Sequence, residues 1–111
     1  MQNASAIQRK IDEVRLRFVT MLAARLDRFE QIRDTLETSD DPAALLDELR
    51  FGAHRIVGLA ATLGFADLGT LAHMVETTTL RASETGAHDV PSPGLLDAID
   101  DLLGEMALLV T

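Results

Sequence analysis

Apolar residues recur at steps of three and four through most of this 111-residue chain, in four segments separated by short polar stretches. This spacing places apolar side chains along one face of an α-helix, whereas a half-buried β-strand would need strict alternation. Leucine, alanine, isoleucine, valine and methionine supply the stripes, and aromatic residues make up only 4% of the chain. Packed helices use such a core, while sheets favour aromatic and β-branched residues. The pattern therefore predicts an all-α fold.

The first helix is predicted from about Ser5 to Thr38. It is long enough that its first two turns could form a short extra N-terminal helix of their own. Its apolar stripe, which we expect to be buried, consists of Ile7, Ile11, Val14, Phe18, Leu22, Phe29, Ile32 and Leu36.

The second helix has a start signal and a stop signal. Asp40 and Asp41 can cap its N-terminus, and Pro42 suits the first turn because the N–H that proline lacks has no partner there. Gly64 can end the helix in a left-handed conformation. The predicted buried stripe consists of Leu45, Leu49, Ala53, Ile56, Ala60 and Leu63.

The third helix follows after a very short link and ends near Gly86, and Ser92 with Pro93 begins the fourth. Residues 86–93 form the one clear loop, which contains His88, a residue without an assigned role. Short connections make successive helices antiparallel. We therefore expect residues 1–111 to form a single domain, an antiparallel up-and-down four-helix bundle. The last two stripes consist of Phe65, Leu68, Leu71, Ala72, Val75 and Thr79, and of Leu95, Leu96, Ile99, Leu102, Leu103, Met106 and Leu109.

The charge of the chain excludes several classes of function. The formal net charge is −8, and it is uneven: up to residue 38 there are seven basic and six acidic residues, and afterwards three basic and twelve acidic. Nucleic-acid binders need a basic surface, so that role is not expected. The chain has no cysteine, no signal-like start and no apolar run long enough to cross a bilayer. A cytoplasmic monomer without a membrane partner is expected.

One histidine lies where the core does not need it. At about 100° per residue, His54 falls roughly 140° from the centre of the buried stripe of the second helix, on the solvent side. Gly58, one turn later, costs about 0.8–1 kcal/mol relative to alanine in a helix interior. An imidazole beside a small residue, with apolar neighbours, suits presentation to another protein. An incidental surface histidine fits the periodicity equally well. The residues that share this face are Arg50, Phe51, Val57, Gly58 and Ala61.

The run from Ala53 to Gly64, AHRIVGLAATLG, resembles the signature of histidine phosphotransfer (HPt) domains. That family shows a histidine, a hydrophobic residue two positions later, a glycine at plus four, small residues and a closing Leu-Gly pair. The pattern is most similar to the N-terminal phosphotransfer domain of chemotaxis histidine kinases, because His73 and Glu76 reproduce the spacing of a second histidine and a glutamate there. The resemblance covers roughly residues 10 to 110.

The resemblance implies a phosphorelay intermediate of two-component signal transduction, which is a phosphoryl carrier and not an enzyme. His54 would accept a phosphoryl group from a histidine kinase or a receiver aspartate and donate it to a receiver aspartate. Glu76 would accept a hydrogen bond from Nδ1–H of His54, which leaves Nε2 free to attack. Phe51, Val57, Gly58, Ala61 and His73 would line the surface on which the partner docks. The protein needs no cofactor of its own, because the receiver domain would bring the Mg²⁺.

Val57 departs from the family pattern, which places a lysine three residues after the phosphorylated histidine. Valine can neither neutralise charge nor donate a hydrogen bond. Arg50, one turn before His54 on the same face, could supply the charge, whereas Arg55 points elsewhere. Two alternatives stay open: an HPt-like module that docks receivers or kinases without being phosphorylated, and a metal site formed by His54, His73 and Glu76. Bundle metal sites normally project several carboxylates into the core, so no metal is expected.

Overall fold

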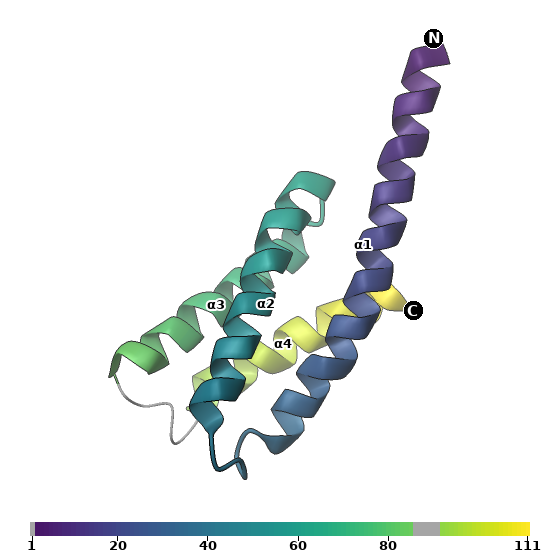
Figure 1. Ribbon diagram of the computed structural model, residues 1–111. Coiled ribbons are helices and arrows are strands. Elements are labelled where there is room, and N and C mark those ends of the chain that lie inside the picture. Colours follow the sequence, from purple (N-terminus) through teal and green to yellow (C-terminus); the bar gives the residue numbers. More distant parts are fainter. Residues whose placement is uncertain (1, 86–91) are drawn as a thin grey trace.

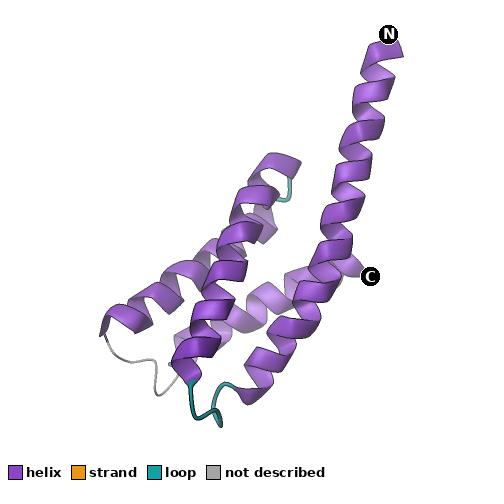
Figure 2. Ribbon diagram, in the orientation of Figure 1, coloured by secondary structure: helices purple, strands orange, loops and turns teal. Residues whose placement is uncertain are grey.

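Residues 2–85 and 92–111 are described by a computed structural model of the chain, and they form an all-helical bundle without strands (Figure 2). Successive helices run in opposite directions, and the chain passes around the bundle in the order of the sequence (Figure 1). The predicted antiparallel up-and-down four-helix bundle is confirmed. The loop predicted at 86–93, with His88, lies largely outside the described residues. The helices are α1 (Gln2–Thr35), α2 (Pro42–Leu63), α3 (Ala66–Thr85) and α4 (Pro93–Val110).

The predicted caps set the ends of α2 and the start of α4. The side chain of Asp41 accepts a hydrogen bond from the N–H of Ala44 at 3.2 Å, and the hydroxyl of Ser92 accepts one from the N–H of Leu95 at 3.1 Å. Gly64 ends α2 with φ of 84°, in the left-handed region that glycine adopts without a steric cost. Because of this tight end, α3 begins two residues later and packs back along α2.

The core contains the central members of all four predicted stripes. Their outlying members, such as Leu45, Leu63, Leu71 and Leu103, pack against it and are only half-buried. Near the Gly64 end of the bundle, the rings of Phe18 and Phe65 approach to 5.3 Å between centroids. The largest fully buried side chains are Leu22, Phe29, Ile32, Leu36, Leu49, Ile56, Leu68, Val75, Leu95, Ile99, Leu102 and Met106.

The first part of α1 corrects the prediction for its stripe. Helix α1 is continuous from Gln2, so a separate N-terminal helix is not formed, and it ends at Thr35, ahead of the predicted Thr38. All residues from 4 to 17, which we call the α1 extension, are exposed. The reason is length: the 34 residues of α1 span about 51 Å, whereas the 22 of α2 span about 33 Å. The first part of the extension therefore projects beyond its neighbours (Figure 1). Its last residues still reach α2, where Nε–H of Arg15 donates a hydrogen bond to the carbonyl oxygen of Leu63 at 3.1 Å. The exposed stripe members of the extension are Ile7, Ile11 and Val14.

Gly52 of α2 lies directly against Phe29 of α1. A Cβ atom built on this buried glycine would lie 2.6 Å from Cζ and 2.8 Å from Cε1 of Phe29, whose ring is fully buried. Real Cβ atoms do not approach other atoms this closely. The absence of a side chain at this position therefore lets the phenylalanine ring fill the space between the two helices.

Two arginines of α1 connect it to its neighbours. Arg28 binds both carboxylate oxygens of Glu48 in α2, at 2.5 and 2.7 Å, and Arg33 binds Asp100 in α4 at 2.9 Å. The hydrogen bonds from Arg28 lower the pKa of Glu48, because they favour its ionised form. Exposed pairs of this kind contribute little free energy, and their effect is to favour one arrangement of the helices.

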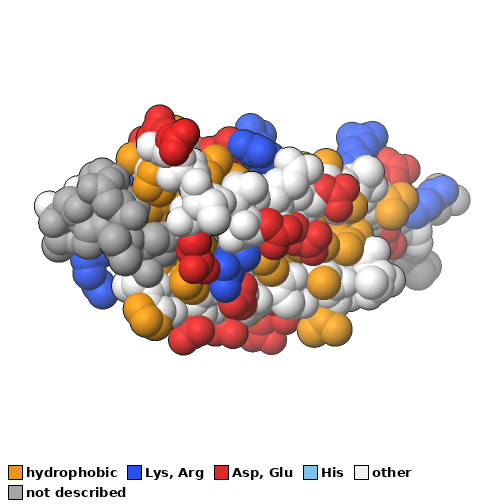
Figure 3. All heavy atoms as spheres, turned by 90° about the horizontal axis from the view of Figure 1, so that it is seen from below, with side chains coloured by type: hydrophobic (Ala, Val, Ile, Leu, Met, Phe, Trp, Pro, Cys, Tyr) orange, Lys and Arg blue, Asp and Glu red, His pale blue; other side chains and the backbone are white. Residues whose placement is uncertain are grey.

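The surface of the bundle is mainly acidic. In the view from below, acidic side chains are spread widely across the visible face (Figure 3). Within residues 2–85 and 92–111, no helix has the length and apolarity that crossing a bilayer requires.

Candidate functional site

His54 lies on the outer face of α2, as its helical position predicts, and its side chain is 74% exposed. Its Nδ1–H donates a hydrogen bond to Oε2 of Glu76, which lies on the neighbouring helix α3. An ionised carboxylate only accepts hydrogen bonds, so in the neutral imidazole the proton is on Nδ1 and Nε2 keeps its lone pair. The arrangement holds the ring in one orientation and leaves a nucleophilic nitrogen accessible.

Glu76 lies between two imidazoles. Its side chain is only 20% exposed, and its second oxygen, Oε1, lies 3.6 Å from Nδ1 of His73, one turn earlier on α3. His73 is itself exposed. His73, the histidine that the resemblance places near the site, is therefore a neighbour of Glu76. Its link to His54 runs through the Glu76 carboxylate, which contacts both imidazoles.

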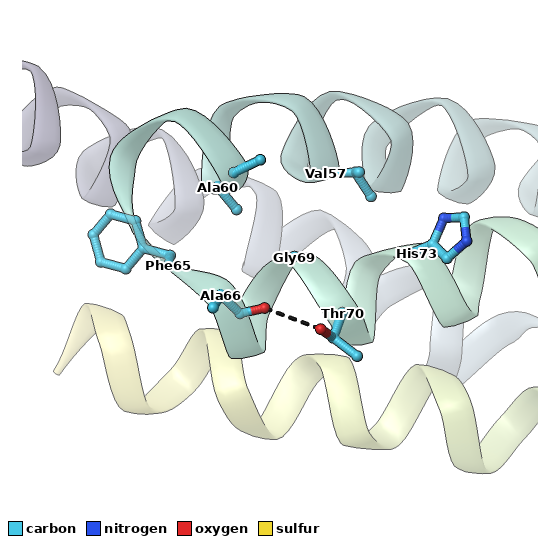
Figure 4. A pocket seen from close by; sticks show the side chains of 8 residues that line it. Val57, Ala60, Phe65, Ala66, Gly69, Thr70 and His73 are labelled. Atoms are coloured by element: carbon cyan, nitrogen blue, oxygen red, sulfur yellow. Dashed lines mark hydrogen bonds between the residues drawn. The ribbon is translucent and has the colours of Figure 1, made fainter.

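Two grooves lie between α2 and α3, one beside the pair of His54 and Glu76 and one that includes it. The first, which we call the alanine groove, is lined mostly by small and apolar residues, and Val57 from α2 and His73 from α3 point into it (Figure 4). The second, the Phe51 groove, contains His54 and Glu76 themselves. The residues of the alanine groove are Val57, Ala60, Ala61, Phe65, Ala66, Gly69, Thr70 and His73, and those of the Phe51 groove are Arg50, Phe51, His54, Glu76, Thr77 and Leu80.

Four of the five residues proposed for docking line these grooves, namely Phe51, Val57, Ala61 and His73. Gly58 lines neither groove, and the structure adds other residues to them. Thr77 and Leu80 were missed, although Leu80 lies one turn after Glu76 and outside the buried stripe of α3, which was a usable signal. Gly58 is exposed, and a Cβ atom there would meet nothing within 4 Å. Packing within this chain therefore does not require glycine at position 58.

Two arginines of α2, Arg50 and Arg55, differ in their position relative to the site. Arg50 shares the Phe51 groove with His54, with its guanidinium carbon 4.6 Å from the centre of the Phe51 ring and Nη2 3.6 Å from Oδ1 of Asp47. Arg55 lines a different groove, between α1 and α2, as its position on the helix predicts. Val57 is half-buried and packs against the core, so no cation stands at the place of the family lysine.

The alternative of a metal site gains no support from this geometry. Among the described residues, no three histidine, cysteine, aspartate or glutamate side chains are grouped so that they could hold a metal ion. His54 and His73 contact the same carboxylate but lie on the outer surface of the bundle, where solvent surrounds them.

Comparison with known proteins agrees with the fold. The family model of the Hpt domain matches residues 13–107, which is most of the chain. No curated protein and no solved structure shows significant similarity to it. The closer likeness to the chemotaxis kinases therefore stays a prediction. Members of the family are phosphocarrier modules that interact with kinases and receiver domains, and they are not themselves kinases. The chain belongs to the Hpt domain family, and it is a histidine phosphotransfer module of phosphorelay signalling.

Proposed function

We propose that His54 accepts a phosphoryl group from a histidine kinase or from a phosphorylated receiver aspartate and donates it to a receiver aspartate. The observation that carries this proposal is the exposed His54 ring, whose Nδ1–H is bound by Glu76 while Nε2 stays accessible. Nε2 attacks phosphorus, and the bond from phosphorus to the donor's leaving atom breaks. The leaving group takes the electron pair: it is the carboxylate of a receiver aspartate, or, with a kinase as donor, ADP or the kinase's imidazole. The receiver supplies the Mg²⁺, so this chain needs no cofactor of its own.

The docking surface in this proposal consists of the two grooves beside His54. Phe51 and Leu80 are exposed apolar residues of the Phe51 groove, and Ala61 and Val57 line the alanine groove. Apolar area at the centre and polar groups at the rim are typical of protein interfaces. A receiver that covers both grooves brings its aspartate to Nε2 of His54 and excludes water from the reacting atoms.

The test is phosphoryl transfer to the full chain from a panel of histidine kinases with ATP and of phosphorylated receiver domains. We expect a label that acid removes and base does not, as phosphohistidine requires. If receivers bind the chain but no donor labels it, the carrier proposal fails and the docking module without phosphorylation is favoured. This second function is favoured by the valine at position 57, because an uncharged side chain stands where the family has a lysine.

Removal of the Glu76 carboxylate is expected to slow transfer. In Glu76→Ala, nothing on α3 would hold Nδ1–H of His54, and the ring would sample other orientations and the other tautomer. We expect a loss of roughly 10–100-fold, which is typical when the group that orients a histidine is removed. The measurement is the rate of transfer from a phosphorylated receiver. Glu84→Ala, an exposed acid on the same helix, is the control and should transfer at the wild-type rate.

Introduction of the family lysine should speed transfer. In Val57→Lys, an ammonium group can reach the phosphoryl oxygens on Nε2 of His54. We expect an increase of roughly tenfold, or about 1.4 kcal/mol, and a decrease of this gain with added salt. Val57→Met, which lengthens the side chain without charge, is the control. If Val57→Lys transfers no faster than Val57→Met, Arg50 already supplies the charge or the step does not need it.

A further inference from the structure

The first part of the α1 extension presents an apolar stripe that none of the described residues covers. Ile7 and Ile11 continue the line of Phe18 and Leu22, which are buried in the core, but they are exposed. Val14, between them and Phe18, lines a groove together with Leu59 and Leu63 of α2. Ile7 is 60% exposed. Isolated helices of about 12–15 residues are only marginally stable in water, because most helical stability comes from packing of an apolar face. A helix of this length with such a stripe is therefore expected to pack against another surface.

Basic residues border the stripe on both sides. At about 100° per residue, Lys10 and Arg17 fall along one edge and Arg15 along the other, whereas Asp12 and Glu13 fall on the back of the helix. Nε–H of Arg15 donates a hydrogen bond to the carbonyl oxygen of Leu63 at 3.1 Å, so Lys10 is the basic residue that the inference uses. Residues 4–17 contain four basic and two acidic side chains, and residues 18–111 contain six basic and sixteen acidic ones. Two extensions packed on each other would bring like charges together. The surface that fits the stripe is instead acidic, with an apolar centre.

The outer face of α4 has this character. Asp101, Gly104, Glu105 and Leu108 are spaced so that they share one side of the helix, and Leu108 is 73% exposed. A Cβ atom at Gly104 would meet nothing within 4 Å, so a second helix can approach the backbone closely there. The length also matches: residues 101–110 span about 15 Å, and residues 5–14 of the extension span the same distance. The extension cannot reach this face of its own α4, because α1 leads away from the bundle (Figure 1).

We infer that the chain forms a symmetric dimer in which the α1 extension of each copy packs on the outer face of α4 in the other. Ile7 and Ile11 would contact Leu108 and Gly104, and Lys10 would face Glu105 or Asp101 of the second copy. A two-fold axis makes each contact twice, which doubles the buried area. This inference replaces the expectation of a monomer. It does not depend on phosphorylation, and it leaves His54 accessible, since α2 lies diagonally across the bundle from α4.

Sedimentation equilibrium of the full chain tests the dimer. We expect the wild type to dimerise in the micromolar range, with weaker association at high salt. Ile11→Glu and Leu108→Glu should each raise the dissociation constant at least about 30-fold, which is typical of a residue central to an interface. Leu16→Glu is the matched control, because Leu16 is 68% exposed on the opposite side of the same extension. It should dimerise like the wild type.

A disulfide experiment identifies the contact itself. The chain has no cysteine, so Lys10→Cys and Glu105→Cys each carry a single thiol. Oxidation of a mixture of the two should yield mainly the mixed disulfide, whereas Leu16→Cys mixed with Glu105→Cys should yield little. A wild-type chain that stays monomeric up to millimolar concentration overturns the inference, whether or not the stripe binds a different protein or a lipid surface. The inference is also overturned if the chain dimerises and neither Ile11→Glu nor Leu108→Glu weakens the dimer.

Discussion

His54→Gln should reduce phosphoryl labelling to background with every donor that labels the wild type. Glutamine keeps a polar side chain of similar reach but has no nitrogen lone pair that can attack phosphorus. The fold should be unaffected, because the His54 side chain is 74% exposed and the amide of glutamine can still donate a hydrogen bond to Glu76. The measurement is the label retained after base treatment, together with the free energy of unfolding.

The control for this variant is His73→Gln, which removes the neighbouring imidazole but keeps the pair of His54 and Glu76. It should remain labelled. If His54→Gln is labelled as well as the wild type, the acceptor is another residue and the proposed role of His54 is wrong. Loss of label in both variants would instead mean that His73 is also required for transfer.

Gly52→Leu should lower the free energy of unfolding by at least about 3 kcal/mol, at the upper end of what overpacked cores lose. Even the Cβ atom of the new side chain would lie 2.6 Å from the buried Phe29 ring, and the rest of the leucine has to enter the same space. The ring is fully buried, so moving it aside would displace other core residues. The measurement is urea unfolding followed by circular dichroism.

The same change at Gly58 is the matched control, because it lies on the same helix with open space around it. Gly58→Leu should be at least as stable as the wild type, since it removes a helix-interior glycine that costs about 0.8–1 kcal/mol. Equal stability of Gly52→Leu and the wild type would contradict the tight packing of α2 on α1. Loss of transfer in Gly58→Leu without loss of stability would indicate that Gly58 is kept for docking.

The elements of the fold could be predicted because their signals are local. Asp41, Pro42 and Gly64 mark the ends of α2 through their own backbone chemistry, and the 3–4 spacing marks each buried stripe. The extension could not be predicted, because Ile7 and Ile11 follow the same spacing as Phe18. Whether such a residue is buried depends on how far the other helices reach. Periodicity records what a helix offers for packing, and the lengths of its neighbours decide what is covered.

The site was predicted unevenly for a similar reason. The exposure of His54 follows from its angle on α2, but its contact with Glu76 depends on how α3 packs, and only the family resemblance suggested it. Gly52 was missed because a buried glycine and an exposed one look alike in a sequence. Leu80 was missed because its place beside Phe51 arises from the pairing of two helices.

The left-handed turn at Gly64 has a consequence for which sequences can keep this site. His54 lies ten residues before Gly64 and Glu76 twelve residues after it, which correspond to about 15 and 18 Å along α2 and α3. The turn at Gly64 therefore sets how the two side chains are placed relative to each other. One residue inserted between Gly64 and Glu76 would rotate the position of Glu76 by about 100° around the axis of α3. The carboxylate would then no longer reach the imidazole of His54. Surface loops usually tolerate changes in length. This turn should not, because its length sets the distance between two functional groups far from it.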